Sequence, residues 1–123
     1  MASKRDAAHL QRGRQAERWV DRAARNRGWR RVARNHRSRG GELDLVYTNG
    51  DCLIVVEVRY RARADYGRAA ATVQRAKQRR IIHATRHFLA CHPQYAQHAV
   101  RFDVVGVNAA HELDWIENAF YAE

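Results

Sequence analysis

A β-hairpin in the middle of the chain is the feature that most constrains the fold. The segments ELDLVYT (42–48) and DCLIVVEV (51–58) flank Asn49-Gly50, a dipeptide typical of two-residue hairpin turns. Both arms are almost continuously apolar on one side, which indicates strands covered on both faces. The sequence therefore predicts a central hairpin with helices packed above and below it.

The segments around the hairpin complete an α/β pattern. Besides the hairpin, the expected elements are a helix over 6–28 that stops at Gly28, a strand over 29–37, a loop over 62–68, a helix over 69–91, and strands over 101–107 and 112–116. Their order is α-β-β-β-α-β-β. A chain of 123 residues with 46% hydrophobic residues has room for one core, so residues 1–123 form a single domain in which 1–8 is a flexible basic tail.

The hairpin carries acidic residues where a core is expected. A two-residue turn at Asn49-Gly50 pairs Val46 with Leu53, Asp44 with Val55 and Glu42 with Glu57. Alternation then separates two faces. One face carries Glu42, Asp44, Val55, Glu57 and Arg59, and the other carries Leu43, Leu45, Tyr47, Cys52, Ile54, Val56 and Val58.

Three carboxylates on one face of a central hairpin are costly, because like charges destabilise a sheet and buried carboxylates need partners. A divalent cation such as Mg²⁺ resolves the conflict. The alternative is that the acids lie at strand ends, solvated or paired with arginines. Glu17 interrupts the apolar stripe of the first helix and Lys77 that of the second. Both therefore point toward the same place, unless Lys77 only extends along the edge of its stripe.

The net charge of +10 indicates a polyanionic partner. Residues 1–40 hold 13 basic and three acidic residues, whereas residues 41–123 hold ten of each. Nucleic acid is the commonest such partner, and an acidic protein is the alternative. No apolar run approaches a membrane span and no secretory signal opens the chain. With only two cysteines, a reducing cytoplasm is the expected compartment.

Several blocks of the sequence resemble one bacterial family. They are Gly13 with Ala16-Glu17, Asn35 and Arg37, the segment GELDLV (41–46), the segment EVR (57–59), Lys77, the segment RFDVV (101–105), and Ala119-Phe120. In this order and spacing they resemble the YraN family of small bacterial proteins. The resemblance implies a restriction-endonuclease-like, PD-(D/E)xK single domain with a mixed central sheet flanked by helices, similar to archaeal Holliday-junction resolvases.

The resemblance also implies a nuclease site. Asp44 and Glu57 take the metal-ligand positions, with the carbonyl of Val58 as a third ligand and Glu17 as the supporting acid of the first helix. The bound ion is then Mg²⁺ or Mn²⁺. Arg59 stands at the lysine position of the motif, and because arginine stays protonated it cannot act as a base. Arg59 or Lys77 is then the group that stabilises charge on the phosphate.

The expected function is that of a DNA-binding, Mg²⁺-dependent endonuclease-like phosphodiesterase acting on branched or flapped DNA. The residues expected to bind nucleic acid are Arg37, Arg39, Arg61, Arg63, Tyr66 and Arg68. The alternative is a DNA- or RNA-binding module that keeps the nuclease fold without turnover. Because resolvase-like sites often work as dimers, the oligomeric state stays open between a monomer and a homodimer.

One further cluster is discounted as a metal site. His83, His87 and Cys91 are spaced four residues apart on the second helix, and two histidines at that spacing can share zinc. The pattern has no clear fourth ligand and lies beside the apolar stripe. A solvated or nucleic-acid-facing row of histidines is therefore the preferred interpretation.

Overall fold

Helices and strands follow one another in the predicted order. The computed structural model describes the backbone of residues 4–61 and 73–122 and the side chains of residues 11–60 and 73–122. In these residues the elements are α1 (Lys4–Asn26), β1 (Arg30–Ser38), β2 (Gly41–Thr48), β3 (Cys52–Arg61), α2 (Arg75–Cys91), the short 3₁₀ turn η2 (Pro93–Tyr95), β4 (Ala99–Asn108) and β5 (Leu113–Phe120). None of the described helices is long and apolar enough to cross a membrane.

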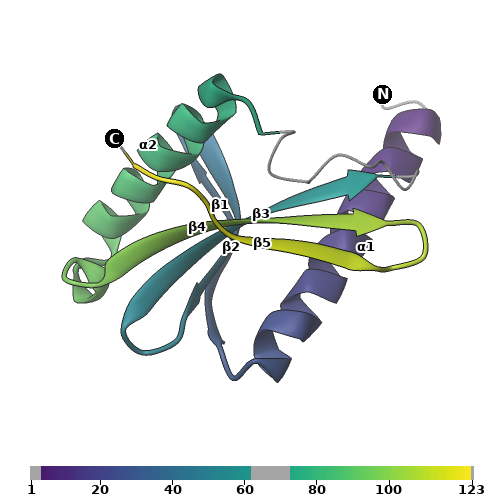
Figure 1. Ribbon diagram of the computed structural model, residues 1–123. Coiled ribbons are helices and arrows are strands. Elements are labelled where there is room, and N and C mark those ends of the chain that lie inside the picture. The colour runs from purple at the N-terminus through teal and green to yellow at the C-terminus, as the bar shows by residue number, and fades with distance from the viewer. Residues whose placement is uncertain (1–3, 62–72, 123) are drawn as a thin grey trace.

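The strands form one mixed five-stranded sheet between the two helices. The strand order is β1-β2-β3-β4-β5, with β3 at the centre, and only β3 and β4 run parallel. The parallel pair is joined through α2, because two parallel strands need a long crossover between them. The helices α1 and α2 lie on opposite faces of the sheet (Figure 1). The predicted α/β domain with a mixed central sheet is confirmed.

Each helix covers one apolar face of the hairpin. Ala16, Val20 and Ala24 of α1 pack with a cluster that includes Leu45, Tyr47, Ile54 and Val56. Ile81, Ala84 and Phe88 of α2 pack with a cluster that includes Val46, Leu53, Val55 and Val104. The small residues on α1 let this helix lie close to the sheet. Two separate apolar clusters therefore hold the β2–β3 hairpin from both sides.

The hairpin turn lies one residue later than predicted. Asn49 pairs with Cys52 through its backbone N–H and the Cys52 carbonyl, at 3.3 Å, so Gly50 and Asp51 form the turn. The Asn49 side chain accepts hydrogen bonds from the N–H groups of both Asp51 and Cys52, and Gly50 takes a φ of 105° that suits glycine. The Asn49-Gly50 dipeptide did not by itself specify which two residues form the turn.

The later turn shifts the strand pairing by two residues. Val46 lies opposite Val55, and Thr48 opposite Leu53. The predicted pairing of Val46 with Leu53 is therefore wrong. A shift of two leaves the faces of β3 unchanged, because side chains alternate with a period of two.

The boundaries of both helices differ from the prediction. The first helix spans Lys4–Asn26 rather than 6–28, so residues 4–8 of the predicted flexible tail are helical. Gly28 ends the first helix region as predicted, with a φ of 85° and a hydrogen bond from its N–H to the Arg25 carbonyl. The second helix begins at Arg75 rather than 69, because Gln74 is extended. Val73 matches the helical stripe in spacing but is buried from the segment before the helix. The predicted loop at 62–68 lies outside the described residues.

A buried aspartate joins β4 to β5. Asp103 is fully buried and accepts hydrogen bonds from Nε and Nη2 of Arg101, both at 2.9 Å. It also accepts hydrogen bonds from Nε1 of Trp115 at 2.9 Å and from the N–H of Asn118 at 3.2 Å. Four donors around one carboxylate satisfy it completely. The aspartate of the RFDVV block is therefore a structural residue of this sheet edge.

Gly41 is required by close packing between β2 and α2. A Cβ at Gly41 would overlap the backbone carbonyl of Arg80 and lie 3.3 Å from Cβ of Ala84. We expect Gly41→Ala to destabilise the protein by about 1–3 kcal/mol, because a backbone atom cannot move aside as a side chain can. Urea unfolding measures the effect.

Gly13→Ala is the matched control for this substitution. A Cβ at Gly13 meets nothing within 4 Å, and the residue lies inside α1. We expect this variant to gain about 0.5–1 kcal/mol. Equal effects of the two substitutions would contradict the assigned contact of Gly41.

Candidate functional site

Asp44 lies where the pairing of β2 and β3 ends. The recorded pairs of the two strands run from Leu45–Val56 to Thr48–Leu53. At the next position the N–H of Val58 donates its hydrogen bond to Oδ2 of the Asp44 side chain, at 2.9 Å, in place of a backbone carbonyl of β2. The Asp44 side chain is thus held at the opening between the two central strands.

Both β1 and β2 change faces at this point. Leu43 packs in the α2 cluster, whereas Leu45 packs in the α1 cluster. On β1, His36 contacts α2 through Phe88, whereas Arg34 lines a cavity beneath α1. Between them Asn35 takes a left-handed φ of 51°, which shorter polar residues tolerate best. The two strands therefore lose their regular alternation side by side, next to Asp44.

This change of face corrects part of the predicted arrangement. Leu43 was expected on the same face as Leu45, and Glu42 on the same face as Glu57. Gly41 and Leu43 instead both pack toward α2, and Glu42 forms an ion pair with Arg37 at 3.8 Å. Strict alternation assumed an unbroken pleat, and the pleat is interrupted.

Glu57 is a buried carboxyl group close to two cations. Its side chain is on β3, and the residue is only 5% exposed. Nζ of Lys77 lies 3.7 Å and Nη2 of Arg59 lies 3.8 Å from Oε1 of Glu57. Burial and the charge of Asp44 raise the pKa of Glu57 to about 8, although Lys77 and Arg59 oppose the shift. Near neutral pH this carboxyl group therefore holds a proton that an exposed glutamate would lose.

Asp44 and Glu57 are electrostatically coupled. The charge of Asp44 is, after burial, the main cause that raises the pKa of Glu57, and Glu57 in turn affects the pKa of Asp44. Burial raises the pKa of Asp44 as well, and the hydrogen bond from Val58 partly opposes that rise. The predicted convergence of Asp44, Glu57, Arg59 and Lys77 is present in the geometry.

Glu17 approaches Asp44 from the α1 side of the sheet. Burial first, and then the charges of Asp44 and Glu42, raise the pKa of Glu17 to about 7. It lies on α1 beside the buried Ala16, as its position in the apolar stripe predicted. Glu17 therefore interacts with Asp44 through charge. Among the described contacts it forms no hydrogen bond with Asp44 or Glu57.

Arg59 has a buried donor with nothing to bind. Its Nε is the one buried side-chain nitrogen or oxygen without a hydrogen-bond partner in the described part of the chain. An unsatisfied buried donor costs about 1–3 kcal/mol. Such a donor near Glu57 is suited to bind an anionic oxygen, such as that of a phosphate.

The oxygen donors at this site are of the kind that Mg²⁺ and Mn²⁺ prefer. Within residues 4–61 and 73–122, no group of three or more acidic, histidine or cysteine side chains surrounds a single point. Asp44, Glu57 and the Val58 carbonyl give an incomplete set of hard oxygen ligands. Mg²⁺ commonly takes one or two carboxylates and completes its shell with water and phosphate oxygens. The residues therefore fit such an ion bound together with a phosphate.

The residues predicted to bind nucleic acid are only partly described. Arg37 and Arg39 are both exposed, and Arg37 pairs with Glu42. The side chain of Arg61 and the whole of Arg63, Tyr66 and Arg68 lie outside the described residues, so these predictions stay predictions.

The histidine row on α2 is partly engaged within the protein. His87 Nδ1 lies 3.1 Å from His36 Nε2, and His87 Nε2 lies 3.9 Å from Cys91 Sγ. His83 packs beside Gly40. Because the two nitrogens of His87 face different neighbours, His83, His87 and Cys91 do not point at one position.

Several residues near the site had no clear signal in the sequence. Arg14, Arg34 and Asn35 line a cavity next to Glu17. Asn35 carried two signs, its place among the residues of the family resemblance and the tolerance of asparagine for positive φ, but nothing in the strand pattern placed it opposite Asp44. The arginines were hidden among many others in the basic N-terminal third.

The pKa of Glu57 makes the stability of the protein depend on pH. The folded state binds this proton more tightly than the unfolded state, whose glutamate has the ordinary pKa of 4.5. Stability is therefore lost as pH rises from about 4.5 to 8. Over this pH range we expect Glu57→Gln to lose less stability than wild type, by on the order of 2 kcal/mol. One pKa unit corresponds to about 1.4 kcal/mol, and rearrangement of the nearby cations reduces the effect of the full shift.

Urea unfolding in a metal chelator at pH 5, 6.5 and 8 measures this difference. Asp51→Asn is the control, because Asp51 is exposed in the hairpin turn. Parallel pH curves for wild type and Glu57→Gln would show that the Glu57 carboxyl group does not ionise in this range.

Comparison with known proteins places the chain in a family. Residues 16–107 match the model described as "Uncharacterised protein family UPF0102". A UPF0102 protein of Aeromonas hydrophila is 46% identical over 106 residues, which cover 85% of this chain and 78% of that protein. Relatives from Saccharophagus degradans (42% identical over 114 residues, 93% and 96% covered) and Dechloromonas aromatica (45% over 115, 91% and 90%) are similar along almost their whole length. The chain therefore belongs to the UPF0102 family, the YraN family.

Proposed function

We propose that this protein is a metal-dependent phosphodiesterase that cleaves DNA, with a restriction-endonuclease-like fold and site. One observation carries the proposal: the half-buried carboxyl group of Asp44 and the buried carboxyl group of Glu57 lie at the opening between two central strands, with Lys77 and Arg59 within 3.8 Å of Glu57. A protein gains nothing in stability from such a pair. Strained or unsatisfied polar groups of this kind mark functional sites.

Asp44, Glu57 and the carbonyl of Val58 are the residues that would hold Mg²⁺ or Mn²⁺. The bound ion would supply Lewis-acid activation of the phosphate and of a water molecule. Because metal ligands must be deprotonated, Glu57 would give up its proton if both carboxyl groups held the ion. The position of Glu17 across the sheet from Asp44 suits a group that holds water near the ion.

The cations beside Glu57 have separate roles in the proposed reaction. The free Nε of Arg59 donates a hydrogen bond to an oxygen of the phosphate and stabilises the negative charge that develops there. Arg59 cannot take a proton from water. Lys77 comes from α2, lies 3.7 Å from Oε1 of Glu57 and is half-buried, and its proposed role is to orient the attacking water.

The basic surface supports nucleic acid as the substrate, and the likeness to resolvases supports branched or flapped DNA. The second candidate is a binding module without turnover. Arg59 favours this candidate, because it stands where the nuclease motif has lysine. The two candidates make the same prediction for binding and opposite predictions for cleavage.

Cleavage of a DNA panel separates the two candidates. Four-way junction, flap, single-stranded and linear duplex substrates are incubated with Mg²⁺ or Mn²⁺ and with wild type, Lys77→Ala or Asp51→Asn. We expect wild type and Asp51→Asn to cleave at least one substrate at equal rates, and Lys77→Ala to be at least 100-fold slower. Salt-dependent binding without cleavage of any substrate would establish the binding module instead.

A further inference from the structure

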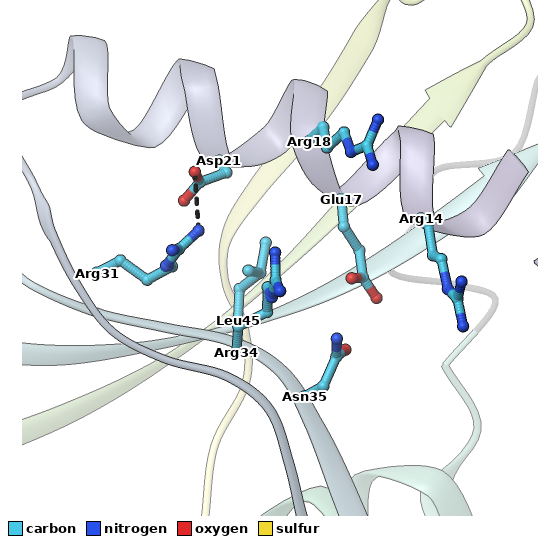
Figure 2. A pocket seen from close by; sticks show the side chains of 8 residues that line it. All are labelled: Arg14, Glu17, Arg18, Asp21, Arg31, Arg34, Asn35 and Leu45. Carbon is cyan, nitrogen blue, oxygen red and sulfur yellow. Dashed lines mark hydrogen bonds and ion pairs between the residues drawn. The ribbon is translucent and has the colours of Figure 1, made fainter. Parts of the chain in front are cut away.

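The charged cavity beneath α1 lies beside the carboxyl pair, because Glu17 lines it and acts on Asp44 through charge. It has a volume of about 340 Å³ and is lined by Arg14, Glu17, Arg18, Asp21, Arg31, Arg34, Asn35 and Leu45. Figure 2 shows Arg14 and Glu17 descending from α1 and Asn35 rising from β1 toward the same space. The cavity is therefore walled by α1 on one side and by β1 and β2 on the other.

One end of this cavity is a fixed structural wall. Asp21 forms ion pairs with Arg25 and Arg31, both at 3.1 Å, and accepts a hydrogen bond from the Tyr47 hydroxyl at 2.8 Å. The dashed contact in Figure 2 is the bond between Arg31 and Asp21. The charge of Asp21 is thus compensated inside the protein, and so is that of Arg31.

The other arginines of the cavity have no such compensation. Among the described contacts, Arg14, Arg18 and Arg34 form no ion pair within 4.0 Å, although Arg14 and Arg34 lie near enough to Glu17 to act on its charge. The guanidinium groups of Arg14 and Arg34 therefore lie near the Glu17 carboxyl group, and Arg18 lines the same cavity. The excess positive charge is concentrated on a concave surface, where an anion is held more strongly than on a convex one.

The shape and chemistry of this cavity suit phosphate. Guanidinium groups bind phosphate oxygens through two parallel hydrogen bonds. The side-chain amide of Asn35 adds a neutral donor at the same place, and the φ of 51° at this residue sets its direction. The buried Leu45 closes the inner end of the cavity. Nothing in the cavity is suited to a large apolar ligand.

The cavity lies next to the proposed reaction site. Glu17 lines it and is coupled by charge to Asp44. If an extended DNA strand placed one phosphate at Asp44 and Glu57, a neighbouring phosphate of the same DNA strand would therefore lie near α1. We propose that Arg14, Arg18, Arg34 and Asn35, the α1 arginine pocket, bind a second phosphate of the DNA strand and fix its register. This inference rests on the proposed function for the path of the strand.

Equilibrium binding in a metal chelator tests the pocket without any cleavage. Wild type, Arg34→Ala, Arg34→Lys and Arg14→Ala are titrated with a labelled oligonucleotide over a range of salt. Arg12→Ala is the matched control, because Arg12 is an exposed arginine of α1 that does not line the cavity. Circular dichroism confirms that each variant is folded, and Arg14→Ala serves as the second test if Arg34→Ala is not.

We expect Arg34→Ala and Arg14→Ala each to weaken binding at least 10-fold and to lower the salt slope by about one. Arg12→Ala should weaken it no more than threefold. Arg34→Lys should weaken it about fivefold despite its conserved charge, since lysine cannot form the two parallel bonds. Equal losses for Arg34→Ala and Arg12→Ala would overturn the pocket and leave only a general basic surface.

The source of the phosphate is resolved by a second comparison. The oligonucleotide is used with a 5′-phosphate and with a 5′-hydroxyl. An Arg34→Ala effect that is equal for both assigns an internal phosphate of the strand, and an effect confined to the first assigns a terminal one. Because these measurements need neither metal nor turnover, the pocket and the nuclease proposal can fail independently.

Discussion

Asp44→Asn is expected to abolish metal binding, weakening the affinity for Mn²⁺ at least 100-fold. Asp44 is the residue held between the two strands by the Val58 N–H at 2.9 Å, so its free oxygen faces Glu57. An amide oxygen is a weaker ligand than a carboxylate and leaves the ion with one negative charge fewer. Cleavage should fall with it, by three orders of magnitude or more, because metal activation supplies most of the proposed chemistry.

Calorimetric titration with Mn²⁺ measures this effect, first for the free protein and then with bound DNA, since a substrate phosphate completes the shell. Asp51→Asn carries the same chemical change in the exposed hairpin turn and should bind as wild type does. If neither the free nor the DNA-bound wild type binds Mn²⁺, the metal site is refuted. If Asp44→Asn binds as tightly as wild type, the ion lies elsewhere.

Asp103→Ala is expected to cause the largest loss of stability, about 3–5 kcal/mol. The substitution removes the acceptor of four hydrogen bonds. It leaves the Trp115 Nε1 without its partner and leaves Arg101 with only its longer ion pair to Glu117, at 4.0 Å. Removing one member of a buried ion pair costs about this much, because the remaining charge loses its close partner. Urea unfolding measures the loss, and Asp51→Ala is the exposed control.

A useful second readout for this variant is Mn²⁺ binding at a temperature where it is still folded. Asp103 lies on β4 and its partners are all on β4 and β5, so binding at Asp44 should be retained. Loss of metal affinity from the folded variant would show that Asp103 belongs to the site. A loss of stability below 1 kcal/mol would show that the four hydrogen bonds contribute little.

Asp44 and Asp103 show why the same residue type serves different purposes. Each lies on an inner strand, within a conspicuous block of the sequence. Asp103 is surrounded by donors that satisfy it, whereas Asp44 has one backbone donor and faces a second carboxyl group. The difference comes from neighbouring residues that are distant in the chain. Only Asp44, whose charge has one donor beside it, is suited to bind a cation.

Much of the site was predictable because strand and helix periods are local properties. The hairpin pattern put Glu57 and Arg59 on one face of β3, and this is confirmed by the contacts of Glu57 with Lys77 and Arg59. Glu17 and Lys77 stood out because each interrupts an apolar stripe. The order of elements and the two covering helices followed from the same periods.

The rest depended on contacts that no local period contains. The turn at Gly50-Asp51 was selected by hydrogen bonds of the Asn49 side chain, which shifted the register by two residues. The positive φ of Asn35 and the change of face at Asp44 lie at facing positions of β1 and β2, between the pairs Arg34–Leu45 and His36–Leu43.

The sequence by itself determined which side chains carry the chemistry, since charges that interrupt a buried pattern are visible in one dimension. Only the tertiary structure decided that Asp44 lies at the opening between β2 and β3, and that Arg14 of α1 and Arg34 of β1 line the same cavity. The physical reason is that burial and Coulomb interaction depend on distance in space, and residues of α1, β1 and β2 approach one another only after the sheet has formed.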